Sequence, residues 1–184
     1  MKKILIIAVI VTLAGALYFF SVAEQEAPAE SAWTETAVSA EALAEIANYE
    51  YTQEYSDSKG RFSFRYPAQF IVSAVPGESG EAILVQNYDT GIGVQILTTP
   101  SGKDADITAG MIREDIPGIR IEDVQVVEIG SNRKGVAFLS NNPEFGGRSR
   151  DVWFMYKKEL YQITTYANQD AFLKGLFGTW KFFR

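Results

Sequence analysis

The sequence contains no histidine and no cysteine among its 184 residues. Without cysteine, the chain has no disulfide framework, no thiol nucleophile and no lipid-modified N-terminal cysteine. Without histidine, it also lacks the Ser-His and Cys-His nucleophile pairs, the imidazole general base and most types of zinc site. Any reaction at this chain would therefore use carboxylate, lysine, tyrosine or serine groups, and we expect no metal and no cofactor.

The chain also lacks a basic region. Its formal net charge is −6, from 17 Lys and Arg residues against 23 Asp and Glu residues. Nine acidic residues and no basic residue lie between Glu24 and Ser58, whereas the remainder from Lys59 to Arg184 is close to neutral. Because nucleic-acid binding requires a basic patch, we expect no nucleic-acid partner.

One long segment, Ile4 to Ala23, is apolar and carries no charge. Twenty helical residues at about 1.5 Å each span roughly 30 Å, the thickness of the hydrocarbon core of a bilayer. Two lysines precede the segment and two glutamates follow it, so the positive-inside rule leaves the N-terminus in the cytoplasm. We expect a single-pass anchor in the cell membrane, in contact with the lipid bilayer, and an extracytoplasmic C-terminal domain.

A cleaved signal peptide is the alternative for this segment. Ser21-Val22-Ala23 has small residues at the two positions that a signal peptidase inspects, which would release a secreted protein after Ala23. The apolar run up to Phe20 is longer than the usual signal-peptide core of about 7–15 residues. The uncleaved anchor, residues 1–23, is therefore the favoured interpretation.

Residues 24–51 are rich in Ala and Glu, and we interpret them as an acidic spacer. A stretch with so few large apolar side chains cannot bury enough surface to offset the entropy lost on ordering. Ser39, followed by helix formers up to Asn48, predicts a short capped helix. It could dock on a partner, but the helical end of a spacer is the favoured interpretation. Residues 52–184 then form one folded domain.

Apolar alternation and short apolar runs predict strands in that domain, within residues 51–66, 70–75, 82–88, 92–98, 124–129, 135–140, 151–157 and 160–167. Two amphipathic helices are predicted, one over 104–115 with Asp104 or Asp106 as its N-cap, and one capped by Asn168 near the C-terminus. Hairpins without alternation of strands and helices indicate an α+β domain, an antiparallel sheet flanked by helices.

Three motifs, at the start, middle and end of this domain, resemble the PsbP-like domain family: Tyr55-x-Asp57-x-x-Gly60-x-Phe62-x-Phe64-x-Tyr66-Pro67, Met111-Ile112-Arg113 and Phe177-Gly-Thr-Trp-Lys-Phe182. The resemblance implies an α-β-α sandwich, used in that family as an accessory or assembly module at membrane-bound complexes. The photosynthetic members lie on photosystem II in the lumen, and that partner is not carried over. With its anchor and acidic spacer, the chain is more similar to the anchored bacterial members, and no functional residues transfer.

Close carboxylate pairs are the candidates for acid–base catalysis or calcium binding: Asp104 with Asp106, Glu114 with Asp115, and Glu122 with Asp123. Adjacent residues on a helix point about 100° apart. Acids at a helix start are also ordinary partners of the helix dipole. We therefore expect no catalytic and no metal-binding role for these pairs.

The candidate partner-contact surface is the segment Asn141 to Arg150, which places Phe145 next to a pair of glycines and close to Arg148 and Arg150. An aromatic side chain with nearby arginines is typical of interface hot spots. The alternative is that Phe145 folds back over an edge of the sheet.

Two functions remain open from the sequence. The first is a non-catalytic, membrane-anchored extracytoplasmic accessory or interaction module with a membrane or cell-envelope protein as its partner. The second is an exported domain that binds a small ligand or hydrolyses a substrate with carboxylates. A deep pocket lined by paired acids would favour the second function, and a filled sheet with a contact loop the first.

Overall fold

The computed structural model describes residues 38–77, 80–102, 105–130, 133–141 and 147–183. The predicted anchor at Ile4 to Ala23 and the first part of the predicted spacer lie outside these residues. Within the described ranges, no helix has the length and apolar character needed to cross a membrane.

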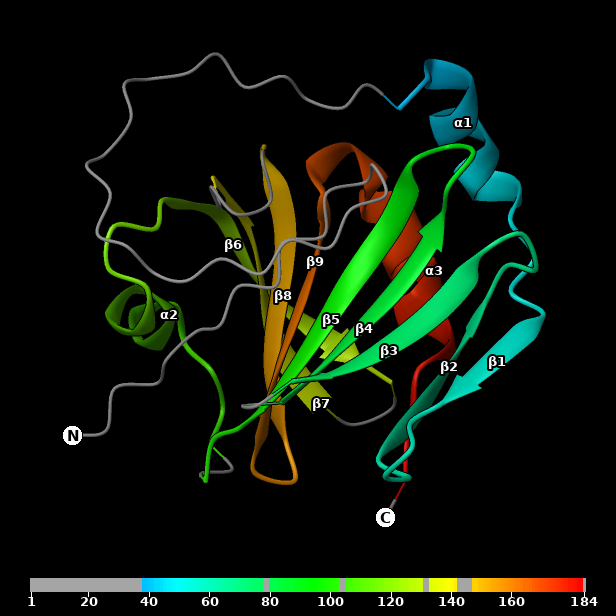
Figure 1. Ribbon diagram of the computed structural model, residues 1–184. Coiled ribbons are helices and arrows are strands. Elements are labelled where there is room, and N and C mark those ends of the chain that lie inside the picture. Colours follow the sequence, from blue (N-terminus) through cyan, green and yellow to red (C-terminus); the bar gives the residue numbers. More distant parts are fainter. Residues whose placement is uncertain (1–37, 78–79, 103–104, 131–132, 142–146, 184) are drawn as a thin grey trace.

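Seven antiparallel strands form the main sheet, in the order β3-β4-β5-β9-β8-β7-β6 (Figure 1). They are β3 (Ile71–Gly77), β4 (Gly80–Asn87), β5 (Ile92–Pro100), β6 (Ile121–Ile129), β7 (Arg133–Ser140), β8 (Ser149–Tyr156) and β9 (Glu159–Tyr166). A separate three-stranded sheet consists of β1 (Gln53–Ser56), β2 (Phe62–Tyr66) and β10 (Lys181–Phe182), with β2 in the centre. The α+β class predicted from the hairpin pattern is confirmed.

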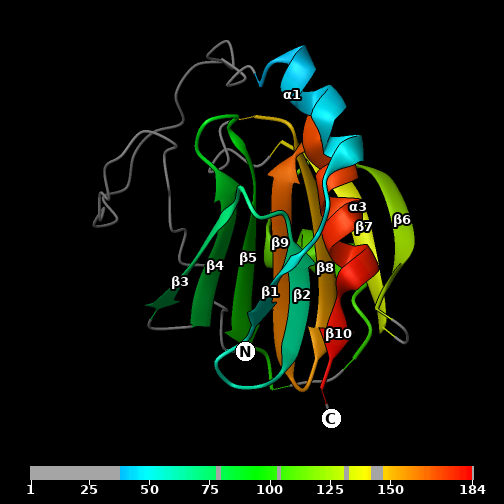
Figure 2. The same ribbon diagram turned by 90° about the vertical axis from the view of Figure 1, so that its right-hand side faces the viewer.

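Helices cover both faces of the main sheet. They are α1 (Ala40–Glu45), which continues into the 3-10 helix η1 (Ile46–Asn48), then α2 (Ala109–Asp115), and finally the 3-10 helix η3 (Ala167–Gln169) with α3 (Asp170–Thr179). Helix α2 lies on one side of the sheet, and α1, α3 and the small sheet lie on the other (Figure 1, Figure 2). The main sheet is thus the middle layer of three.

Strand alternation separates two apolar cores on the two faces of the main sheet. In β8, Val152 and Phe154 belong to the larger core beneath α3 and the small sheet. Their neighbours Trp153 and Met155 belong to the smaller core beneath α2. Strand β8 is therefore buried on both faces, as its large apolar residues predict.

Helix α2 is shorter than the sequence pattern predicts. Its N-cap is Thr108, whose side-chain oxygen accepts a hydrogen bond from the backbone N–H of Met111 at 3.3 Å. Asp106 lies outside the helix, and Asp104 lies outside the described residues. The prediction of an aspartate cap was wrong. The Thr108 side chain accepts a hydrogen bond from a backbone N–H of the first turn, so the helix begins after Thr108 rather than after an aspartate.

At the C-terminus, the predicted cap Asn168 lies inside η3, and Gln169 takes the N-cap position of α3 without a side-chain bond to the helix. The buried Gln169 amide instead accepts a bond from the N–H of Gly93 at 2.9 Å and donates to the carbonyl of Gly91 at 3.2 Å. These bonds tie the start of α3 to the β4–β5 hairpin. The apolar face of this amphipathic helix packs inward, with Leu173 2% exposed.

The short helix predicted after Ser39 forms, and the Ser39 hydroxyl accepts a bond from the N–H of Ala42 at 3.1 Å. Its residues Ala42 and Ile46 are buried in the larger core. Just after η1, Tyr49 meets Phe70 edge to face, with ring centroids 5.5 Å apart. The helix is therefore part of the packed domain, and the interpretation of residues 38–51 as spacer is corrected.

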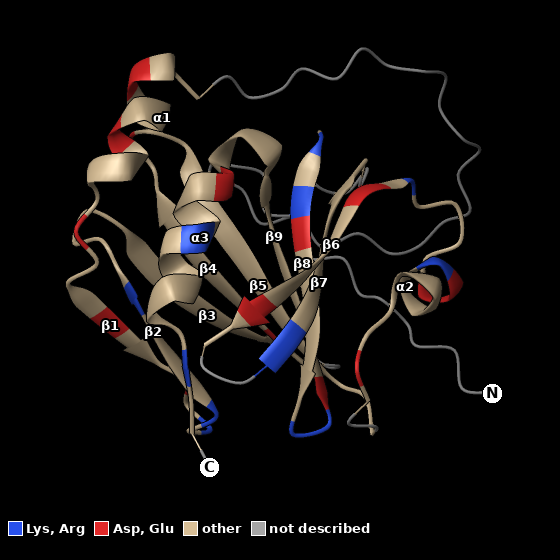
Figure 3. Cartoon of the chain, turned by 180° about the vertical axis from the view of Figure 1, so that it is seen from behind, with Lys and Arg blue, Asp and Glu red and all other residues tan. Residues whose placement is uncertain are grey.

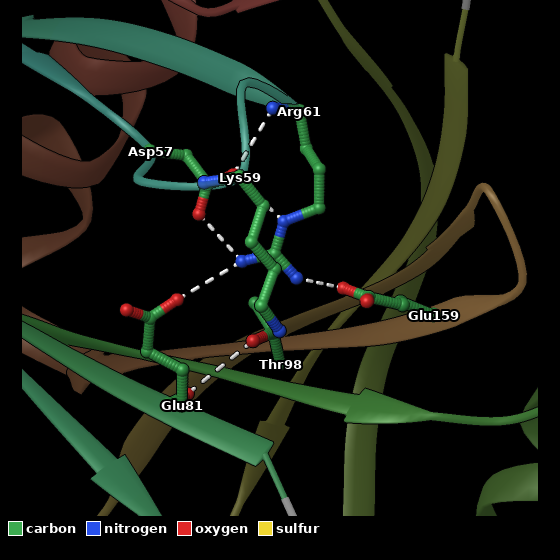
Figure 4. A network of polar contacts seen from close by, with 6 residues as sticks. All are labelled: Asp57, Lys59, Arg61, Glu81, Thr98 and Glu159. Carbon is green, nitrogen blue, oxygen red and sulfur yellow. Dashed lines mark hydrogen bonds and ion pairs between the residues drawn. The ribbon is translucent and has the colours of Figure 1, made fainter.

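A buried ion network joins the two sheets at Arg61 (Figure 4). The Arg61 side chain, 6% exposed, lies just before β2 and donates to Asp57 at 2.7 Å, to Glu81 of β4 at 3.0 Å, and to Glu159 of β9. Burial opposes ionisation of Asp57, but the hydrogen bonds from Arg61 outweigh it and keep the pKa of that carboxyl below its usual value. The network holds the β1–β2 turn against the main sheet.

Candidate partner-contact surface

The two predicted arginines lie where β8 begins, and their side chains reach the edge strand β6. The Arg148 guanidinium bonds the Glu122 carboxylate at 2.8 Å, and the Arg150 guanidinium bonds the Asp123 carboxylate at 3.0 Å. Phe145, the third predicted contact residue, lies outside the described residues. The structure therefore pairs two of the three predicted residues with neighbouring acids of β6.

A break in the regular ladder lets two adjacent acids reach these arginines. Neighbouring residues of a regular strand point to opposite faces of a sheet. The β6–β7 pairing shifts register between Glu122 and Gln125, and Asp123 has a φ of +48°. The hydrogen bond from Gln125, together with that from Arg150, lowers the pKa of Asp123. Glu122 and Asp123, considered above as a catalytic pair, are instead partners in ion pairs.

A third arginine, Arg120, completes this surface. Its guanidinium bonds the same Glu122 at 2.8 Å, so one carboxylate serves both Arg120 and Arg148. Both arginine side chains are exposed, at 76% and 60%. Both arginines line a hollow of about 480 Å³, to which Leu139 contributes an apolar side chain. The surface carries more positive than negative charge and can receive an acidic group.

Arg120 was missed by the sequence analysis, since it is a single arginine before β6 and its neighbour Arg148 comes from another part of the chain. No local signal marks it. Only the pairing of β6 with β7, and of β7 with β8, brings the two together.

A larger crevice, of about 660 Å³, lies between α3 and the strands β6, β7 and β8. Figure 3 shows this side of the molecule, with α3 beside those strands. The strands contribute Val127, Ala137 and Val152, and α3 contributes Leu173 and Phe177. These side chains make an apolar crevice.

Charged groups line the rim of the crevice. Arg150 stands at one end, where it bridges Asp123 of β6 and, at 3.5 Å, Asp170 of α3. Asp170 also pairs with Lys174 at 2.7 Å. The Arg150 side chain is only 12% exposed, in contrast to Arg148. Arg150 therefore connects α3 to strand β6 at the end of the crevice. Arg148 does not line the crevice.

One carboxyl group is buried elsewhere, on the sheet face that carries α2. Asp151 accepts hydrogen bonds from Ser140 at 2.8 Å, Ser149 at 2.7 Å and Thr164 at 2.7 Å. Burial raises the pKa of Asp151. The three hydroxyl donors come from β7, β8 and β9, so this group links three strands. Within the described ranges, no cluster of three or more potential ligand residues is arranged to hold a metal ion.

Comparison with known proteins supports the fold alone. No family model matches the chain, and no curated protein matches it. A crystal structure from Bacteroides thetaiotaomicron VPI-5482 is similar, with a TM-score of 0.52 and 14% identity over 73% of this chain. This chain spans about half the length of that protein, as the match covers 50% of it.

The solution structure of cyanobacterial PsbP (CyanoP) from Synechocystis sp. PCC 6803 is also similar. Its TM-score is 0.43 and its identity 11%, over 71% of this chain and 92% of that one. A TM-score at this level carries no argument about function.

Proposed function

We propose that the protein is a non-catalytic interaction module of the PsbP-like type, held on the outer side of the cell membrane by the Ile4 to Ala23 segment. Its partner is a membrane or cell-envelope protein. The observation that carries this proposal is the apolar crevice between α3 and the strands β6 to β8, which lies beside the exposed arginines 120 and 148.

The two neighbouring features define the chemistry of the partner. The crevice accepts an apolar side chain, because Val127 and Phe177 are only partly covered. The surface outside it accepts a carboxylate, because two arginines share one glutamate there. A protein segment with an apolar anchor close to an acidic residue satisfies both.

The volume of the crevice also favours a second candidate, a domain that binds a small apolar ligand, since ligand pockets measure roughly 300–1,000 Å³. The hydrolytic form of that alternative gains no support from the crevice. Its two acidic residues, Glu128 and Asp170, come from different elements, and Asp170 is bound to Lys174.

Adjacent valines of β6 give a matched test. Val127 lines the crevice, whereas Val126 is 73% exposed on the opposite face of the sheet. Full-length chains carrying Val127→Arg or Val126→Arg are purified from solubilised membranes, and the proteins retained are compared with those of the unaltered chain. We expect Val127→Arg to lose a protein that Val126→Arg retains. Retention of the same proteins by both variants would overturn the proposal.

The small-ligand alternative is decided with the same variants. An apolar fluorescent probe should bind the unaltered chain and Val126→Arg, and lose affinity for Val127→Arg, if the crevice takes small molecules. Loss of probe binding without loss of any retained protein would favour the ligand function.

Membrane attachment has its own measurement. The intact mass of the protein in the membrane fraction should correspond to a chain that still contains Ile4 to Ala23. A mature chain beginning at Glu24 would show that the segment is a cleaved signal peptide.

A further inference from the structure

The main sheet has two edge strands, and they differ in how they are protected. Edge strands expose backbone groups that pair with other chains unless charge or a bulge prevents it. Strand β6 contains three acids and the irregularity between Glu122 and Gln125. Strand β3 contains no charged residue and pairs with β4 in unbroken register from Ile71 to Gly77. Strand β6 is thus protected by charge and by a bulge, whereas β3 has only Pro76 near its end.

Strand β3 also exposes apolar side chains. Ile71 is 54% exposed and Val75 is 42% exposed. Ser73 lies between them, and residues spaced by two point to the same face of a sheet. No other strand among the described residues pairs with the outer side of β3. This edge therefore combines exposed apolar side chains with backbone groups available for pairing.

We propose that two copies of this chain associate through their β3 strands, in antiparallel pairing about a two-fold axis at Ser73. In that register Ile71 lies opposite Val75 of the second copy, and Val75 lies opposite its Ile71. In the same way, Val72 lies opposite Ala74 of the second copy, and Ala74 lies opposite its Val72. The two exposed apolar residues of each copy are thus covered by those of the other, as a two-fold interface requires.

The sequence of β3 favours a second copy over a different partner. The strand is self-complementary about Ser73, because the two residues before it and the two residues after it are all apolar. Without charge it offers no group that selects a partner of opposite sign, and two copies meet without repulsion. Pro76 has no backbone N–H, which limits the pairing to about five residues.

Tyr88 adds to this edge. It follows β4, its side chain is 60% exposed, and its hydroxyl accepts a hydrogen bond from the side chain of Gln86. Gln86 in turn pairs with Ile71 across the β3–β4 ladder. The exposed ring therefore extends the apolar edge beyond Ile71.

The interface is small compared with the roughly 1,200 Å² or more that stable complexes bury, so the association is weak in dilute solution. Attachment of both copies to one membrane would raise their effective concentration. The inference does not depend on the partner surface at Arg148, which lies at the other edge of the sheet, and either can fail without the other.

The absence of cysteine permits a clean test, because one introduced cysteine has no thiol partner within its own chain. Antiparallel residues directly opposite each other have Cα atoms about 4.5–5.5 Å apart, within the range that a disulfide spans. Full-length Ser73→Cys is oxidised in membranes, with Val126→Cys on the other edge strand as the control. We expect Ser73→Cys to form a disulfide-linked dimer at least tenfold faster.

A second substitution separates specific pairing from random collision. Adding Val75→Lys to Ser73→Cys places a charge opposite Ile71 of the second copy, so we expect the rate of crosslinking to fall to that of Val126→Cys. Equal rates for Ser73→Cys and Val126→Cys would overturn the proposal. So would a rate unaffected by Val75→Lys, or an adduct with a different protein in place of the dimer.

Discussion

Two arginine-centred regions of this molecule show how burial assigns different roles to the same side chain. Arg61 is almost fully buried and bonds carboxylates from three places in the fold. Arg148 is 60% exposed and pairs with one carboxylate, which it shares with Arg120. A buried charge that loses its partner is costly, whereas an exposed ion pair contributes about 0–1 kcal/mol. Arg61 therefore stabilises the fold, whereas we propose a partner contact for Arg148.

Arg150 is intermediate between these two. Its side chain is 12% exposed, and it bridges acids of β6 and α3 at the end of the crevice. The three arginines form a series of increasing exposure, which predicts a series of decreasing effects on stability.

The largest effect is expected at Arg61. Arg61→Met leaves Asp57 buried without its cation, and breaking a buried pair in this way costs about 3–5 kcal/mol. The free energy of unfolding, measured in urea by tryptophan fluorescence, should fall by that amount. A loss below about 1 kcal/mol would mean that the two sheets are held together by apolar packing alone.

A smaller loss is expected at Arg150. Arg150→Met removes its contacts with Asp123 and Asp170 but keeps the aliphatic stem, so the loss should be about 1.5–3 kcal/mol, as for a hydrogen bond to a charged group. The same urea experiment measures it. A loss as large as that of Arg61→Met would contradict the ordering by exposure.

The two buried carboxyls predict opposite responses to acid. The folded-state pKa of Asp57 is lowered, so its stabilising effect is fully present above the ordinary aspartate pKa of about 3.9 and is lost as the pH falls through the lower folded value. The folded-state pKa of Asp151 is raised, so its protonation favours the folded state as the pH falls through that raised value.

Unfolding measurements between neutral pH and about pH 3 would distinguish the two groups. The stability advantage of the unaltered chain over Asp57→Asn should stay constant at first and shrink below about pH 4. The unaltered chain should gain stability relative to Asp151→Asn as the pH falls, and this gain should begin at a higher pH than the change seen with Asp57→Asn. Identical pH profiles for the two variants would contradict the assignments.

The strands were predictable because their evidence is local. Alternation and turn residues in each segment mark the pairs that form hairpins, and Gly60, with a φ of +63°, lies in the turn before β2. The separate small sheet was not predictable, since β2 pairs with β10 from the opposite end of the chain. No local pattern records such a pairing.

The candidate site was predictable only in part for the same reason. The composition around Arg148 and Arg150 is a local signal. It identified Arg148, which is exposed, and Arg150, which lies at the rim of the crevice. Their acidic partners on β6 were considered as a catalytic pair, because adjacency in sequence does not show what faces them. The crevice is assembled from three strands and α3, so no single segment reveals it.

We propose that Arg148 serves association rather than stability, and one paired measurement tests this directly. Full-length Arg148→Glu is compared with Arg65→Glu, which makes the same charge change at another exposed arginine with a single acidic neighbour. Proteins crosslinked to each variant in intact membranes are quantified, and the unfolding free energy of each purified variant is measured. We predict unfolding free energies within about 1 kcal/mol of the unaltered chain for both variants, with a partner lost only from Arg148→Glu. Equal retention of every crosslinked protein by the two variants would contradict it.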